Sequence, residues 1–196
     1  RERAARSAHW SGPRGPRLDG RAITVVGLVI LAAYTVDSAV SSWSSVHLLA
    51  IGAAVALAPV GLAAYQGGVL AARLATDAVV RRLGRGRLLA IGLVLGVTGA
   101  IVVAAVPTPA VAIGAFAVSG LAVGALVPLA FGLAGGIDPA RSDEVIARVN
   151  LFNYAGAVLG AVGVGVLTDV TGSGLAFLLP ALLLVAAVPA WRRAPA

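Results

Sequence analysis

Apolar residues form long runs along the chain, separated by short polar segments. The runs cover positions 22–42, 50–76, 88–106, 110–133, 149–168 and 175–191. An α-helix needs about 20 apolar residues to cross the hydrocarbon core of a bilayer, and the runs match this requirement. They lack the alternation that marks barrel strands, and only helices and closed barrels satisfy backbone polar groups in lipid. The pattern predicts an all-α, polytopic membrane protein with six transmembrane helices.

Composition excludes most soluble classes of protein. Hydrophobic residues make up 59% of the 196 positions and charged residues 12%, against about 25% charged in an average soluble domain. The chain has no cysteine, which excludes disulfides, thiolate metal sites and cysteine nucleophiles. The histidines, His9 and His47, lie in the basic leader and in a predicted outer loop, so a serine such as Ser119 has no base beside it. We expect no enzyme activity, no metal site and no cofactor.

Arginines divide the polar segments into two alternating groups. The segments 1–21, 77–87 and 134–148 and the C-terminal end contain arginines, whereas the segments 43–49, 107–109 and 169–174 contain no Arg or Lys. The positive-inside rule therefore places both termini in the cytoplasm. We predict a cytoplasmic basic linker over 1–21, a six-helix transmembrane bundle over 22–193 and a cytoplasmic tail over 194–196. The net charge of +7 does not indicate nucleic-acid binding, because the arginines are spread over short loops without interleaved aromatic residues.

The chain is expected to be a fragment or a processed piece, because it begins with Arg1 and contains no methionine. Its leading stretch lacks the apolar core of a signal peptide. All 15 basic side chains are arginine, which together with the richness in Ala, Gly and Val suggests a GC-rich bacterial genome. We therefore expect a bacterial protein of the cell (inner) membrane.

A basic segment follows the second apolar run. Arg73 and Asp77 lie one helical turn apart, and a carboxylate this near a helix C-terminus opposes the macrodipole. The segment resembles the loop motif of the major facilitator superfamily, in which an Arg, an Asp four residues later and a basic loop with Gly precede the next helix. The resemblance implies a conformational switch that holds one access state, formed by Arg73, Asp77, Arg81, Arg82, Gly84, Arg85 and Arg87. The alternative is that Asp77 caps a short turn over 78–83 while the arginines only set topology.

One carboxylate, Asp37, lies within the first apolar run. Asp37 followed by Trp43 and Ser44 resembles the outer end of the seventh helix in a bacterial subgroup of the superfamily. An ionised carboxylate costs about 2.5–3.5 kcal/mol at the membrane centre, so Asp37 is expected to face a wet cavity. As a hypothesis, it binds a proton or a polar group of the substrate. The alternative places Asp37 in solvent at the outer interface, with Trp43 as an aromatic-belt anchor.

Further polar side chains lie inside the predicted helices: Tyr65, Gln66, Asn150, Asn153 and Tyr154. The last three share one helix face. In the superfamily the counterparts of these helices line the central cavity, so the resemblance makes these residues, with Asp37, the candidate substrate-binding set. The alternative is interhelical hydrogen bonding, which is worth about 0.6–2 kcal/mol per contact in membranes.

The second and fifth runs share the pattern Y-x-G-x-V-L-x-A, over 65–72 and 154–161. In the predicted topology these helices run in opposite directions, as inverted repeats do in secondary transporters. Glycines spaced as G-x-x-x-G permit close helix approach, with static packing favoured over sliding. The pairs are Gly92/Gly96, Gly120/Gly124 and Gly156/Gly160. Pro59 and Pro128 are expected to kink their helices.

The resemblance extends over most of the chain and implies an MFS-like C-terminal bundle of two inverted three-helix repeats. The expected function is that of the C-terminal half of a secondary transporter, which moves a small solute by alternating access, with proton coupling through Asp37 as a hypothesis. The expected partners are the lipid bilayer, the N-terminal six-helix half of the same transporter, a small-molecule substrate and protons. The alternative is a self-contained six-helix membrane protein that acts as an oligomeric permease or permease subunit.

Overall fold

The structure, a computed structural model, describes residues 18–192. Within this range the regular structure is entirely helical and contains no strand, so the predicted all-α class is confirmed. The predicted linker, apart from positions 18–21, and the predicted tail at 194–196 lie outside the described residues.

Long helices joined by short connections make up the described chain. The first begins after Asp19, whose carboxylate accepts hydrogen bonds from the backbone N–H groups of Arg21 and Ala22. This N-cap satisfies amides that a first helical turn leaves free. In chain order the helices are α2 (Gly20–Ala50), the 3-10 turn η1 (Val55–Leu57), α3 (Ala58–Leu83), α4 (Arg85–Ala105), α5 (Pro109–Ile137), the 3-10 turn η2 (Pro139–Arg141), α6 (Ser142–Val158), the π-helical turn η3 (Leu159–Gly163), α7 (Val164–Thr171), α8 (Ser173–Ala176) and α9 (Leu178–Arg192).

Several of these stretches can cross a bilayer. Among residues 18–192, the five that are long and apolar enough are Gly20–Ala50, Val55–Leu83, Arg85–Ala105, Pro109–Ile137 and Pro139–Thr171. The sixth predicted run, 175–191, overlaps a shorter apolar stretch, Ser173–Val188, which breaks at Phe177 between α8 and α9. The chain is therefore a polytopic helical membrane protein, as predicted.

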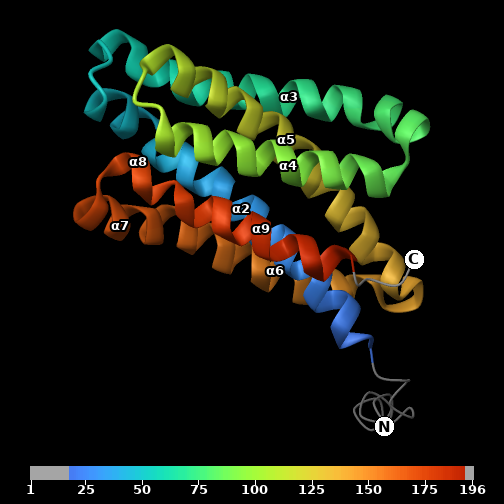
Figure 1. Ribbon diagram of the computed structural model, residues 1–196. Coiled ribbons are helices and arrows are strands. Elements are labelled where there is room, and N and C mark those ends of the chain that lie inside the picture. The colour runs from blue at the N-terminus through green and yellow to red at the C-terminus, as the bar shows by residue number, and fades with distance from the viewer. Residues whose placement is uncertain (1–17, 193–196) are drawn as a thin grey trace, which may run out of the picture.

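α2 and α5 connect the other helices (Figure 1). α3 and α4 pack on α5, α6 and α9 pack on α2, and α2 also packs on α5. The beginning of α2, the α3–α4 turn and the α5–α6 connection gather at one end of the bundle, and the remaining connections gather at the other. The arginines of these three segments therefore share one end, which agrees with the division seen in the sequence.

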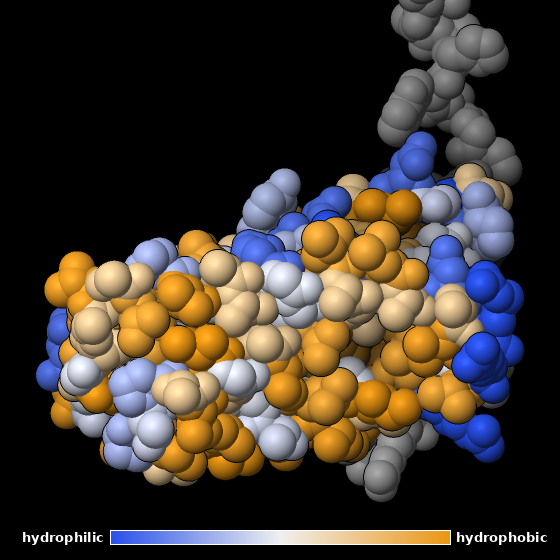
Figure 2. Space-filling model, turned by 90° about the horizontal axis from the view of Figure 1, so that it is seen from above, coloured by the Kyte–Doolittle hydropathy of each residue, from blue (hydrophilic) through white to orange (hydrophobic). Residues whose placement is uncertain are grey.

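The surface is apolar along most of the bundle. Figure 2 shows hydrophobic residues across the middle of one face and hydrophilic residues towards the ends. Large apolar side chains are exposed on the long helices, for example Leu74 on α3, Val94 on α4 and Leu182 on α9. Soluble monomers rarely expose so wide an apolar surface, whereas lipid-facing helices require one.

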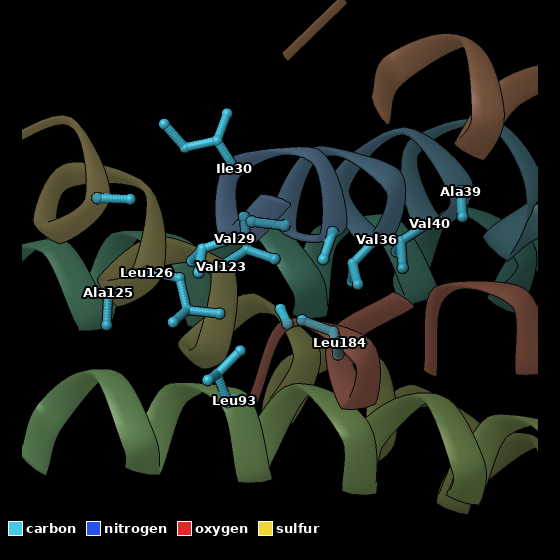
Figure 3. Close-up of a cluster of buried hydrophobic side chains, with 14 of the residues drawn as sticks. Val29, Ile30, Val36, Ala39, Val40, Leu93, Val123, Ala125, Leu126 and Leu184 are labelled. Atoms are coloured by element: carbon cyan, nitrogen blue, oxygen red, sulfur yellow. The ribbon is translucent and has the colours of Figure 1, made fainter. Parts of the chain in front are cut away.

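The buried core joins four helices (Figure 3). Val36 of α2, Leu93 of α4, Leu126 of α5 and Leu184 of α9 lie in one cluster, each at most 2% exposed. Because lipid tails are as apolar as leucine, burial from water does not hold these helices together. Close van der Waals packing of the kind seen here supplies the association instead.

Glycines bring helix backbones into direct contact. A Cβ on Gly120 of α5 would lie against the carbonyl oxygen of Tyr65 of α3, and a Cβ on Gly156 of α6 would lie against the carbonyl oxygen of Leu31 of α2. Only glycine permits this approach. The close contacts predicted from the G-x-x-x-G spacing are therefore present in the α3–α5 and α2–α6 pairs.

α2 is longer than the predicted first helix. The segment 43–49, predicted as an outer loop, continues the helix to Ala50. Ser44, His47 and Leu48 are each at most 1% exposed, because other helices pack against this extension. The prediction ended the helix at polar residues that tertiary packing buries.

α3 continues past its predicted end at position 76 to Leu83. Arg81 and Arg82 form its last turn, where positive charge interacts favourably with the helix dipole. The helix ends at Gly84, whose φ of 81° lies in the left-handed region that suits glycine.

The two prolines predicted to kink helices occupy different places. Pro59 lies in the first turn of α3, where proline fits without disturbing the helix, so the kink predicted there is wrong. Pro128 lies inside α5, where its missing N–H leaves out one backbone hydrogen bond; the kink there stays a prediction.

The fifth predicted span contains an irregular turn. α6 passes into the π-helical turn η3 and continues as α7. Such a turn breaks the regular backbone pairing of the helix. The indole Nε1 of Trp43 on α2 donates a hydrogen bond of 2.8 Å to the carbonyl oxygen of Ala161 within η3. α2 therefore fixes this turn through a side chain.

A Trp43→Phe variant should test this contact. The change keeps an aromatic ring but leaves the Ala161 carbonyl without the indole donor, so we expect the free energy of unfolding to fall by about 1–2 kcal/mol. Thermal unfolding in detergent would measure it. Tyr154→Phe, which removes an exposed hydroxyl, is the control, and equal unfolding temperatures for the two variants would contradict the role of the bond.

Candidate functional site

A polar pair lies between α2 and α3. The hydroxyl of Tyr65 donates a hydrogen bond of 2.7 Å to Oδ1 of Asp37. Tyr65 is fully buried at 0% exposure, whereas Asp37 is half-buried. α2 continues for 13 residues after Asp37 to Ala50, about 20 Å at 1.5 Å per residue. Asp37 thus lies in the body of its helix rather than at its end.

Two further residues belong to this neighbourhood. Tyr34 lies one turn before Asp37 on α2, and Arg73 lies on α3 on the side of Tyr65 nearer the α3–α4 turn. Both are close enough to interact electrostatically with Tyr65. We call Tyr34, Asp37, Tyr65 and Arg73 the polar cluster. Sequence reasoning missed Tyr34, although its spacing of three residues from Asp37 places both on one helix face.

The remaining candidate cavity residues lie on α3 and α6. Gln66 on α3 and Tyr154 on α6 are exposed, and Asn150 and Asn153 on α6 are half-buried. These residues therefore lie on two helices, α3 and α6, each of which packs on α2. Within the part of the chain that the structure describes, these four side chains make no hydrogen bond, so the alternative of interhelical hydrogen bonding fits only Tyr65.

Arg73 and Asp77 of the switch motif line a pocket beside α5. Arg73, Thr76 and Asp77 form one wall, Val127 and Pro128 form the other, and the volume is about 340 Å³. α3 runs unbroken through Asp77, so the alternative in which this residue caps a short turn is wrong.

The other arginines of the motif are exposed on either side of the turn at Gly84: Arg81 and Arg82 at the end of α3, and Arg85 and Arg87 at the start of α4. The ion pairs among residues 18–192 join Arg141 to Asp138 and Arg148 to Glu144. The charges of the motif therefore make no ion pair within the described chain.

The connection between α5 and α6 is held by its own ion pair. Arg141 approaches Asp138 at 2.7 Å, and the resulting hydrogen bond lowers the pKa of the Asp138 carboxyl from its ordinary value. A lowered pKa means that the contact contributes stability at neutral pH and loses it only as the pH falls through that value.

His47 lies within α2 and not in an outer loop, which corrects the prediction for this residue. Its Nδ1 is 3.0 Å from the Oγ of Ser173 on α8. The rings of Phe116 and Phe177 lie beside it, with centroids 6.1 and 5.4 Å away. His47 thus links α2 to α8 through packing, and residues 18–192 contain no group of three metal-ligating side chains.

These features define a class of protein: a polytopic helical membrane protein with a polar cluster among apolar helices. An uncharacterized transporter of Sinorhizobium fredii (strain NBRC 101917 / NGR234) is 27% identical over 175 residues, which are 89% of this chain and 46% of the relative. An uncharacterized MFS-type transporter of Yersinia pestis is 25% identical over 164 residues, which are 83% of this chain and 43% of the relative. No family model matches the chain.

The chain is therefore related to membrane transporters, and its predicted resemblance to the major facilitator superfamily is confirmed by these relatives. The matched regions span less than half the length of either relative.

Proposed function

We propose that the chain is the C-terminal six-helix half of a secondary transporter of the major facilitator superfamily, which moves a small solute by alternating access. The observation that carries this proposal is the Tyr65–Asp37 hydrogen bond between two membrane-spanning helices. A carboxylate in such a helix is costly unless it serves an aqueous path or a ligand. Asp37, only half-buried, is open to such a path.

The polar side chains on α3 and α6 suit a cavity that a second bundle completes. Gln66 and Tyr154 expose polar groups from helices otherwise rich in apolar residues, and Asn150 and Asn153 lie on the same face of α6 as Tyr154. Groups of this kind are not stable against lipid tails. A facing bundle, the N-terminal half of the transporter, would enclose them in a water-filled space at the midplane.

The pairing of the helices supports an inverted repeat. α3, the second helix of the first three-helix unit, packs closely on α5, the first of the second unit, and α6 packs in the same way on α2. Glycines make both contacts, through Gly120 and Gly156. The shared sequence pattern is a poorer guide, because Tyr65 is buried and its counterpart Tyr154 is 65% exposed.

Asp37 is the proposed proton-binding group. Its carboxylate accepts the hydrogen bond from the hydroxyl of Tyr65, and the positively charged Arg73 lies near Tyr65. Protonation would remove the negative charge of Asp37 from this cluster. In the proposed mechanism this change biases the two access states, with Arg73 and Asp77 of α3 as part of the switch.

Transport by the full-length protein tests the proposal. The protein would be reconstituted in proteoliposomes and offered labelled sugars, amino acids, organic cations and organic anions with and without a proton gradient. We expect saturable uptake of one class without ATP, and none by residues 1–196 alone. Transport by these residues alone, or flux only with an added ATPase subunit, would favour the self-contained permease instead.

A further inference from the structure

An apolar groove lies between α3 and α4, on the half of the bundle that carries the α3–α4 turn. α5 forms its floor, and its volume is about 150 Å³. Its lining includes Ala72, Ala75 and Val79 on α3, Ile91 and Gly92 on α4, and Leu121 on α5. The groove exists because α3 and α4 both pack on α5 but scarcely touch each other, and because small residues line much of it.

The groove opens to the surface of the membrane-spanning region. Ala75, Ile91 and Leu121 are exposed along it. Ala72 and Val79 are seven residues apart on α3, so the groove follows the helix for about 10 Å. Its shape and chemistry suit an extended hydrocarbon chain that lies along the helices.

Positive charge stands at one end of this groove. Val79 of α3 and Leu88 of α4 line the groove at this end. Arg81 and Arg82 follow Val79 on α3, and Arg85 and Arg87 precede Leu88 on α4. We call these four residues the arginine cluster. All four are exposed, and the ion pairs of the described residues involve other arginines. The first turn of α4 contains no acidic residue.

We infer that this place binds an anionic phospholipid, with its phosphate among the arginine cluster and one acyl chain in the groove. Guanidinium groups bind phosphate through paired hydrogen bonds. Clusters of at least four basic residues beside a membrane-spanning helix attract anionic lipid. The lining of the groove is almost entirely apolar, so it offers contacts to an acyl chain that a free anion could not use. The inference goes beyond the proposed function.

Native mass spectrometry of the full-length protein tests the inference. Phosphatidylglycerol would be compared with phosphatidylcholine of the same acyl chains and with glycerol 1-phosphate, which has the anionic headgroup and no chains. We expect phosphatidylglycerol to bind at least tenfold more tightly than either. Equal binding of phosphatidylcholine would overturn the role of charge. Equal binding of glycerol 1-phosphate would identify a free-anion site and overturn the role of the groove.

Paired variants separate the two parts of the site. Arg85→Gln/Arg87→Gln should weaken phosphatidylglycerol binding by about 25-fold, about fivefold for each arginine near the membrane surface. Arg21→Gln/Arg148→Gln removes arginines outside the cluster, one in the first turn of α2 and one in the first half of α6, and should leave the binding within twofold. Equal effects of the two double variants would contradict the assigned site.

The groove has its own matched pair. Ala75→Phe should fill the groove and weaken phosphatidylglycerol binding about tenfold, whereas Ala90→Phe places the same ring at an exposed position of α4 outside the groove. Unfolding temperatures measured alongside identify a variant that has lost its fold. A folded Ala75→Phe protein that binds as tightly as the Ala90→Phe protein would overturn the acyl-chain position. None of these tests needs a transported solute, so their failure and that of the proposed function are distinguishable.

Discussion

An Asp37→Asn variant of the full-length protein is expected to transport its solute at least 30-fold more slowly, with a residual rate that no longer changes with pH. The amide has the size of the carboxylate and still accepts the hydrogen bond from Tyr65, so the packing of α2 on α3 is kept. What disappears is the charge. With it go its interactions with the Tyr65 hydroxyl dipole and with Arg73, which for a charge in a partly buried site we take as about 2 kcal/mol, or about 30-fold.

The pH profile of uptake between pH 5 and 9 is the measurement. Asp169→Asn, which neutralises an exposed carboxylate at the end of α7, is the matched control and should keep the wild-type profile. Tyr65→Phe removes the hydrogen bond but keeps the charge, so it should shift the profile without flattening it. A pH dependence in Asp37→Asn that equals wild type would contradict proton coupling through this residue.

Replacing Gly120 by leucine should strongly destabilise the bundle. A Cβ at this position would lie against the Tyr65 carbonyl oxygen and close to the amide nitrogen of Val69, so α3 and α5 would have to separate. The backbone cannot move aside as a flexible side chain can. We therefore expect the free energy of unfolding to fall by at least about 3 kcal/mol, the upper end of the range for overpacked cores. For a unit of this size that corresponds to a fall of about 10 °C in unfolding temperature.

The same substitution at Gly114 is the control. Gly114 lies on the same helix and is exposed, and nothing lies within 4 Å of a Cβ built there. Gly114→Leu should therefore leave the unfolding temperature in detergent within about 2 °C, because leucine also favours helix. Similar losses at the two positions would mean that leucine disturbs α5 itself and not its contact with α3.

The membrane-spanning segments could be predicted from the sequence, because long apolar runs have few other stable solutions. Their ends could not. α2 reaches Ala50 because Ser44 and His47 are buried by other helices, and hydropathy does not register a polar residue that packing hides. Nothing in the local sequence predicts the π-helical turn η3 either. The hydrogen bond that holds it comes from Trp43, more than 100 positions away in the chain.

The candidate site divides in the same way. Asp37 and Tyr65 could be identified from the sequence because a polar side chain inside an apolar run must contact water or another polar group. The structure brings the two together. Their pairing depends on how α2 and α3 are set against each other, which periodicity within one helix does not encode. The nearness of Tyr34 to Asp37 follows instead from their spacing of three residues on α2. Tyr154 looks equivalent to Tyr65 in the repeated pattern but lies exposed, because α6 presents a different face to α2 than α3 presents to α5.

The central claim is that the face around the polar cluster lines an aqueous path. Residues 1–196 contain no cysteine, so single cysteines at Gln66 and Asn153 can be tested with a membrane-impermeant thiol reagent once any cysteines in the rest of the full-length protein are removed. Val94, 64% exposed on the apolar α4, is the lipid-facing control. The account predicts rapid labelling of Gln66→Cys and Asn153→Cys and none of Val94→Cys. If all three are equally inert in intact and permeabilised cells, no aqueous path reaches this face and the account is wrong.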